Sequence, residues 1–121
     1  MRLNHATSIV SVFDRSIVFY TKLGLTPIMI EEARYVCFTL PNGDETIFLE
    51  VTGEAMSESR VQLYLECRNL DALCEELTEQ GFKFEQPPTD LSYLWTEARL
   101  RDPDGHQLRL YRDDGNRLNP P

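Results

Sequence analysis

NLDALCEELTEQGF, at residues 69–82, decides the fold of the second half of the chain. Its apolar side chains fall on one face of a helix, which Asn69 can begin and Gly81 can end. The preceding VQLYLEC (61–67) alternates with a period of two and predicts a strand. Further strands are predicted at 82–86, 93–100 and 106–112, with a loop at 87–92 and a proline turn, DPDG, at 102–105. This order is βαβββ.

The first half of the chain repeats this order. Residues 3–10 predict a strand, Ser11 with Asp14 resembles a capping box, and the helix that follows ends at Gly24. Strands follow at 25–31, 34–40 and 46–52, with a hairpin turn, PNGD, at 41–44. Gly24 and Gly81 are 57 positions apart (24 to 81), as are Ile17 and Cys74 (17 to 74).

We therefore predict an α+β fold built from two βαβββ modules with helices on one outer face. The first module spans 1–52 and the second spans 61–112, joined by a connector at 53–60. Residues 113–121 form a loose tail, and the whole is one domain.

The two faces of the predicted strands differ in chemistry. One face is apolar and suits the helices, whereas the other mixes aromatic with polar side chains. The aromatic positions of this second face are Phe48, Tyr64, Trp95 and Tyr111. Such a face predicts a small-molecule pocket, and the alternative is a partly covered sheet face or a dimer surface.

Charge and composition exclude several partners. The 121 residues carry a formal net charge of −8 without a local basic cluster, which disfavours nucleic acid and anionic membranes. No apolar run approaches the ~18 residues of a membrane span, and the start lacks the pattern of a secretory signal. We therefore expect a cytoplasmic protein. The three cysteines fit no zinc spacing and are expected to be buried, reduced thiols.

These motifs resemble the vicinal oxygen chelate superfamily, which includes glyoxalase I, bleomycin-resistance proteins and extradiol dioxygenases. The resemblance covers about residues 1–112 and is closest to bacterial lactoylglutathione lyase. Its carriers are MRLNH (1–5), DRSIVFYTKLGL (14–25), IFLEVT (47–52), the 69–82 segment and DPDGHQLRLY (102–111). The resemblance implies two modules that form a cupped, half-open mixed sheet around a ligand, commonly in a homodimer.

In glyoxalase-like members the first and last strands of each module supply four metal ligands. Carried over by resemblance, these positions are His5, Glu50, Gln62 and Arg109, with Glu50 also placed to move a proton as the catalytic carboxylate. Arg109 does not fit, because a guanidinium has no lone pair to donate. We therefore expect Arg109 to pair with Glu50 and replace the metal, so that the protein needs no cofactor.

The sequence is compatible with three functions. The preferred one is metal-independent binding of a small molecule by Phe48, Tyr64, Trp95, Arg109 and Tyr111. The alternative is a lactoylglutathione lyase-like enzyme that holds zinc or nickel through His5, Glu50 and Gln62. The third is a module whose cup another protein closes. Three further positions have simpler interpretations: His106 as an exposed residue at a strand start, and Glu97 with Arg99 as either cup-lining residues or a solvated pair.

Overall fold

The computed structural model describes residues 1–41, 43–54, 59, 62–91 and 95–113. The chain divides into two compact units, Met1–Ser57 and Glu58–Pro121, which we call module 1 and module 2 and describe separately. Asn42 of the predicted hairpin turn, part of the connector and the tail from residue 114 lie outside the described residues.

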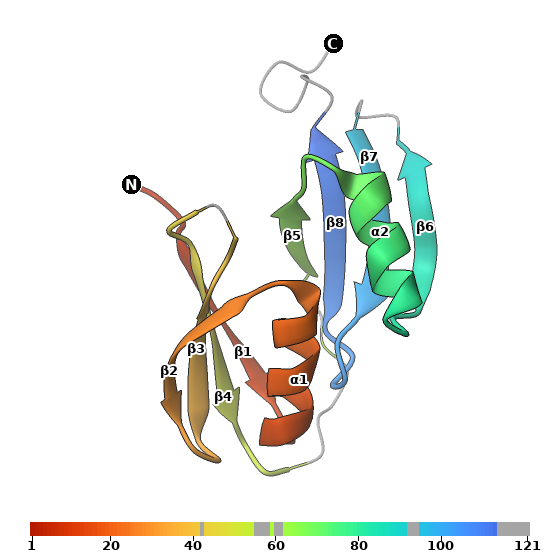
Figure 1. Ribbon diagram of the computed structural model, residues 1–121. Coiled ribbons are helices and arrows are strands. Elements are labelled where there is room, and N and C mark those ends of the chain that lie inside the picture. Colours follow the sequence, from red (N-terminus) through yellow and green to blue (C-terminus); the bar gives the residue numbers. More distant parts are fainter. Residues whose placement is uncertain (42, 55–58, 60–61, 92–94, 114–121) are drawn as a thin grey trace. The chain divides into compact units, whose positions relative to one another are not determined.

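Module 1 contains four strands and one helix (Figure 1). The elements are β1 (His5–Val10), α1 (Phe13–Leu23), β2 (Thr26–Glu31), β3 (Tyr35–Thr39) and β4 (Thr46–Val51). The strand order in the sheet is β1-β4-β3-β2, with β1 parallel to β4 and the other pairs antiparallel.

Module 2 has the same topology. Its elements are β5 (Gln62–Glu66), α2 (Leu70–Glu79), β6 (Phe84–Asp90), β7 (Trp95–Arg101) and β8 (Gln107–Asp113). The order β5-β8-β7-β6, with β5 parallel to β8, matches module 1 strand for strand. The predicted α+β fold of two βαβββ modules is confirmed. In the described residues, no helix is long and apolar enough to cross a membrane.

Each helix covers one face of its own sheet. In module 1 the buried Tyr20 of α1 contacts Phe38 of β3, with ring centroids 6.0 Å apart. In module 2, Leu77 of α2 and Leu110 of β8 are each 1% exposed. The helix-side faces carry the largest buried apolar side chains of the strands, because alternate strand residues point to the helix. The other face of each sheet carries no helix of its own module, and we call it the helix-free face.

The helix boundaries correct one prediction and confirm another. The N-cap of α1 is Val12 and has no side-chain cap hydrogen bond, so Ser11 does not form a capping box. Instead, the Ser11 hydroxyl accepts a hydrogen bond from Arg15, and the helix begins one residue later than a capping box at Ser11 requires. Gly24 does end α1, with φ of +121°, and its N–H donates to the Thr21 carbonyl.

Replacing Gly24 by alanine tests this helix end. A Cβ at position 24 would meet no atom within 4 Å, so backbone strain at positive φ is the main cost. We expect Gly24→Ala to lower the free energy of unfolding by about 1 kcal/mol in urea titrations. Thr21→Ala, at an exposed site in the same helix, is the control and should change it by less than about 0.5 kcal/mol. Equal effects would contradict the strain argument.

Strand β6 is longer than the sequence indicated. The loop predicted at 87–92 was wrong for its first part, because β6 continues through Pro87 and Pro88 to Asp90. Two prolines are compatible with this strand because β6 is at the sheet edge and its pairing with β7 shifts between Gln86 and Thr89. Prolines lack the N–H of a paired strand and are therefore confined to such edges and bulges.

The DPDG turn is confirmed, but its neighbour is not exposed. Gly105 N–H donates to the Asp102 carbonyl at 2.9 Å, and Gly105 has φ of +88°. The Asp102 carboxylate accepts backbone N–H bonds from Asp104 and His106, both at 2.9 Å. His106 is 8% exposed, so its prediction as an exposed strand-start residue was wrong. The turn is therefore closed by hydrogen bonds to Asp102, and His106 is buried.

Candidate functional site on the helix-free faces

The helix-free face of module 1 is an aromatic surface centred on Phe48. Its ring contacts Tyr35 at 4.8 Å and His5 at 6.1 Å between centroids, both edge-on. Phe48 is half-buried, whereas Phe38 on the opposite face is fully buried. Phe48 therefore has the position predicted for it, on the face away from α1.

The register of module 1 separates His5 from Glu50. In the parallel pair, His5 lies opposite Thr46 and Glu50 lies opposite Ile9, four residues further along. At about 3.3 Å per residue this is a separation of about 13 Å along the strands. The row of Thr7 and Phe48 lies between them. The structure thus keeps both residues on one face but does not bring them together.

The imidazole ring of His5 forms hydrogen bonds with residues of β1 and β4. Its Nδ1 lies 2.5 Å from the Thr46 hydroxyl, and its Nε2 lies 3.3 Å from the Thr7 hydroxyl. Both ring nitrogens therefore have a hydrogen-bond partner. A metal at His5 would have to displace one of these hydroxyls.

Arg109 is the centre of the helix-free face of module 2. Its Nη1 donates to Glu97 Oε2 at 3.0 Å and its Nε donates to Gln107 Oε1 at 3.2 Å. The guanidinium carbon lies 5.4 Å from the centroid of the Tyr64 ring, a cation–π contact. Tyr64 in turn contacts Tyr111 edge-on at 6.1 Å. Three of the predicted pocket residues are therefore in one cluster.

Glu97 gives Arg109 a carboxylate in its own sheet. The prediction that Arg109 pairs with Glu50 involves both modules and stays a prediction, whereas the ion pair with Glu97 joins neighbouring strands β7 and β8. Glu97 is fully buried, so its interpretation as half of a solvated pair was wrong. Its Oε2 also lies 3.4 Å from Arg99 Nε, and Arg99 is directly opposite Arg109 in the register. One carboxylate therefore holds two facing guanidiniums together.

The other two predicted site residues of module 2 are Gln62 on β5 and Trp95 on β7. Gln62 is exposed and opposite Gln107, two residues before the row of Tyr64 and Arg109. Trp95 begins β7, two residues before Glu97. The role of Glu97 was not predicted, although the alternation of β7 places it on the same face as Arg99, the residue opposite Arg109.

The four positions carried over from metal-binding relatives do not fit a metal ion. Arg109 has no lone pair and is bound to a carboxylate, while His5 and Glu50 are about 13 Å apart along their strands. Among residues 1–41, 43–54, 59, 62–91 and 95–113, no group of three or more His, Cys, Asp or Glu side chains could hold an ion. We therefore derive no chemistry through a metal.

Comparison with known proteins agrees with this architecture. Residues 2–110 match the Glyoxalase/Bleomycin resistance protein/Dioxygenase superfamily. The chain belongs to this superfamily. The uncharacterized protein YraH of Bacillus subtilis (strain 168) is 30% identical over 129 residues, covering 93% of this chain and 98% of YraH. Membership is thus shown, and the resemblance read from the motifs is confirmed.

Two solved structures of the superfamily share the fold. A member from Sphaerobacter thermophilus is 24% identical, with a TM-score of 0.74 over 93% of this chain and 98% of that chain. The lactoylglutathione lyase from Agrobacterium tumefaciens is 12% identical, with a TM-score of 0.79 over 98% and 96%. At these identities the likeness concerns the fold alone.

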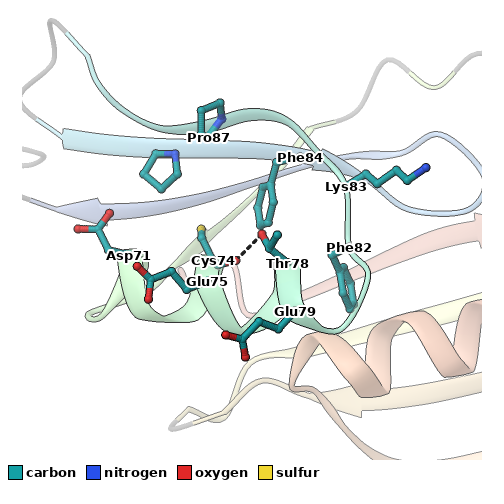
Figure 2. Close-up of a pocket in the computed structure, with 10 residues that line it drawn as sticks. Asp71, Cys74, Glu75, Thr78, Glu79, Phe82, Lys83, Phe84 and Pro87 are labelled. Carbon is teal, nitrogen blue, oxygen red and sulfur yellow. Dashed lines mark hydrogen bonds between the residues drawn. The ribbon is translucent and has the colours of Figure 1, made fainter.

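Module 2 also has an open groove on its helix side, with a volume of about 980 Å³ (Figure 2). It lies between α2 and β6 and is lined by Cys74, Thr78, Phe82 and Phe84 with acidic side chains from α2. Thr78 Oγ1 donates to the Cys74 carbonyl at 2.8 Å. Burial raises the pKa of the Cys74 thiol to about 11, with smaller contributions from Cys67 and Asp71. A thiol with this pKa is protonated at neutral pH and is not a nucleophile.

The two thiols of module 2 predict a pH effect on stability. Burial, then Glu66, also raises the pKa of Cys67 from 9.0 to about 11. Because the unfolded chain loses these protons first, the free energy of unfolding is unaffected below pH 9 and falls between pH 9 and 11, by roughly 1–3 kcal/mol. Urea titrations at pH 8 and pH 10.5 measure the fall.

The control for this effect is the variant Cys67→Ser with Cys74→Ser. Other groups also titrate above pH 9, so the difference between wild type and variant isolates the thiols. We expect a smaller fall in the variant. The same fall in both proteins would show that the thiols do not carry the effect.

Proposed function

We propose that this superfamily member binds a small molecule on the helix-free face of its sheets without a metal ion. The observation that carries the proposal is Arg109, a cation fixed by Glu97 and Tyr64 at a position where metal-binding relatives have a ligand. A permanent positive charge there opposes a divalent cation and favours an organic ligand with negative or π-electron character.

The flanking aromatic side chains support this proposal. Tyr64 is 44% exposed, which is high for an aromatic side chain that also contacts Tyr111 and Arg109. Phe48 is half-buried on the equivalent face of module 1. Aromatic rings with few polar groups are typical of pockets for small organic molecules. Trp95, the single tryptophan of the chain, is the fourth residue proposed for the face of module 2, beside Tyr64, Arg109 and Tyr111, and its side chain lies outside what the structure describes.

Ligand-observed NMR tests the proposal with a library of neutral aromatic and carboxylate fragments in EDTA. We expect binders in EDTA, and we expect Tyr64→Ala to weaken the aromatic ones about fivefold. Val18→Ala, at an exposed position on α1, is the control and should change nothing. Binding that appears only after nickel or zinc is added, together with turnover of methylglyoxal and glutathione, would instead support a lactoylglutathione lyase-like enzyme.

Two further features belong to this proposal. Strands β1 and β2, and β5 and β6, are the edges of their sheets, and a homodimer would cover such edges. The free thiols of Cys37, Cys67 and Cys74 suit the reducing cytoplasm. Light scattering tests the first feature, and a monomer at micromolar concentration would contradict it.

A further inference from the structure

Three buried polar atoms on β6 and β7 make no hydrogen bond, and one of them, Arg99 Nε, has only an ion-pair contact with Glu97. Gln86 Nε2, Glu97 Oε1 and Arg99 Nε are all buried and make no hydrogen bond. Gln86 and Arg99 are opposite each other in the register, and Glu97 precedes Arg99 by two residues on the same face. In the described residues the fourth such atom is Ser16 Oγ, in module 1. Native proteins pair nearly all buried polar groups, so this cluster needs a partner.

The charges of the cluster do not balance. Arg99 and Arg109 are directly opposite each other, and like charges in this arrangement repel. Both are held by the same carboxylate oxygen, Glu97 Oε2, at 3.4 and 3.0 Å. Two guanidiniums and one carboxylate leave one positive charge.

Among the described residues, neither Glu85, the partner of Arg101, nor Glu66 supplies the missing negative charge. Arg101, next on the same face of β7, is already paired with Glu85 at 3.0 Å. Glu66 is at the end of β5, opposite Tyr111, and is exposed to water. Glu97, Arg99 and Arg109, counted by themselves, therefore carry one excess positive charge.

The cluster is open to solvent at Arg99. The Arg99 side chain is 34% exposed, whereas that of Arg109 is 16% exposed and that of Glu97 is 1% exposed. Arg99 Nε makes no hydrogen bond and lies 3.4 Å from Glu97 Oε2. The three atoms without a hydrogen bond are themselves buried, so a ligand reaches them only when the partly exposed Arg99 side chain moves aside, while Arg109 stays fixed.

From these observations we propose that the helix-free face of module 2 binds a small 2-hydroxycarboxylate. Gln86 and Arg99 donate hydrogen bonds to the carboxylate of the ligand, and Glu97 Oε1 accepts one from its hydroxyl group. The single negative charge of the ligand balances the excess charge of Glu97, Arg99 and Arg109, and its donor and acceptor groups match the three atoms without a hydrogen bond. This inference rests on the proposed metal-independent binding and names the class of ligand.

A hydroxyl group fits better than an ammonium group as the donor. An amino acid would also offer a carboxylate and a donor, but its ammonium would sit beside two guanidiniums. Its net charge of zero would also leave the excess positive charge uncompensated. A simple carboxylate without a hydroxyl would leave Glu97 Oε1 without a donor, at the cost of an unpaired buried acceptor.

Three small probes of similar size separate the contribution of the ligand's negative charge from that of its hydroxyl group. Glycolate has both groups, acetate lacks the hydroxyl and glycolamide lacks the charge. We expect calorimetric or NMR titrations of the full chain, in EDTA at constant ionic strength, to show glycolate binding at least tenfold more tightly than either. Equal affinity for glycolate and acetate, or no binding of glycolate, would overturn the inference without any variant.

Matched arginine variants locate the site. Arg99→Gln should weaken glycolate binding at least tenfold, whereas Arg101→Gln, on the same face of the same strand, should leave it unchanged. If Arg99 has only a structural role, Arg99→Gln lowers the urea midpoint but leaves the glycolate affinity unchanged, and the inference fails. If neutral aromatic fragments bind in EDTA and glycolate does not, this inference fails and the proposed function stands. If neither binds until nickel is added, the proposed function itself fails.

Discussion

Glu97→Ala is expected to lower the free energy of unfolding by about 3–5 kcal/mol at pH 7, one of the largest effects of any single substitution in module 2. Glu97 is fully buried, and its Oε2 contacts both Arg99 and Arg109. Without it, two guanidiniums face each other across β7 and β8 with no counter-charge. Breaking a buried ion pair costs more than the pair contributes, because the remaining charge stays desolvated.

Glu85→Ala is the matched control for Glu97→Ala. Glu85 also pairs with an arginine of β7, Arg101, at 3.0 Å, but both side chains are nearly half exposed. An exposed pair contributes about 0–1 kcal/mol, so urea titrations should separate the two variants by more than 2 kcal/mol. A loss below about 1 kcal/mol for Glu97→Ala would mean that the buried carboxylate is not what holds the two arginines.

Phe38→Ala should destabilise module 1 by a comparable amount, about 3–5 kcal/mol. Phe38 is fully buried on the helix side of the sheet and contacts Tyr20 of α1. Removal of its ring leaves a cavity that the helix and the strands cannot fill without moving. Urea titration followed by circular dichroism measures the loss.

Phe48→Ala is the comparison for Phe38→Ala, because the two residues are on opposite faces of one sheet. Phe48 is half-buried and contacts His5 and Tyr35. Its removal should cost roughly 1–2 kcal/mol, since less apolar area returns to water. Equal losses would contradict the assignment of Phe38 to the core and Phe48 to the helix-free face.

The topology could be predicted from sequence because it depends on periodicity. The helical spacing of Leu70, Cys74 and Leu77, together with the 57-position offset between Gly24 and Gly81, defines two equivalent modules. Element ends were less predictable where tertiary structure overrides local preference. The two prolines of β6 suggest a loop, and only the edge position of that strand allows them to extend it.

The candidate site was only partly predictable for a related reason. Alternation placed Arg109 and Tyr64 on the helix-free face, as found. The distance between His5 and Glu50 depends on the register of β1 and β4, which strand patterns do not specify. The burial of Glu97 depends on the packing around its two arginines, and a charged residue in a strand is usually exposed.

Calorimetric titration of the protein with zinc and nickel tests whether ligand binding on the helix-free face is independent of a metal ion. After treatment with EDTA and dialysis, we expect no saturable binding of either metal at neutral pH, and we expect glycolate or fragment binding that added metal does not change. One equivalent of metal bound tightly by the wild type and lost in His5→Ala would contradict the claim.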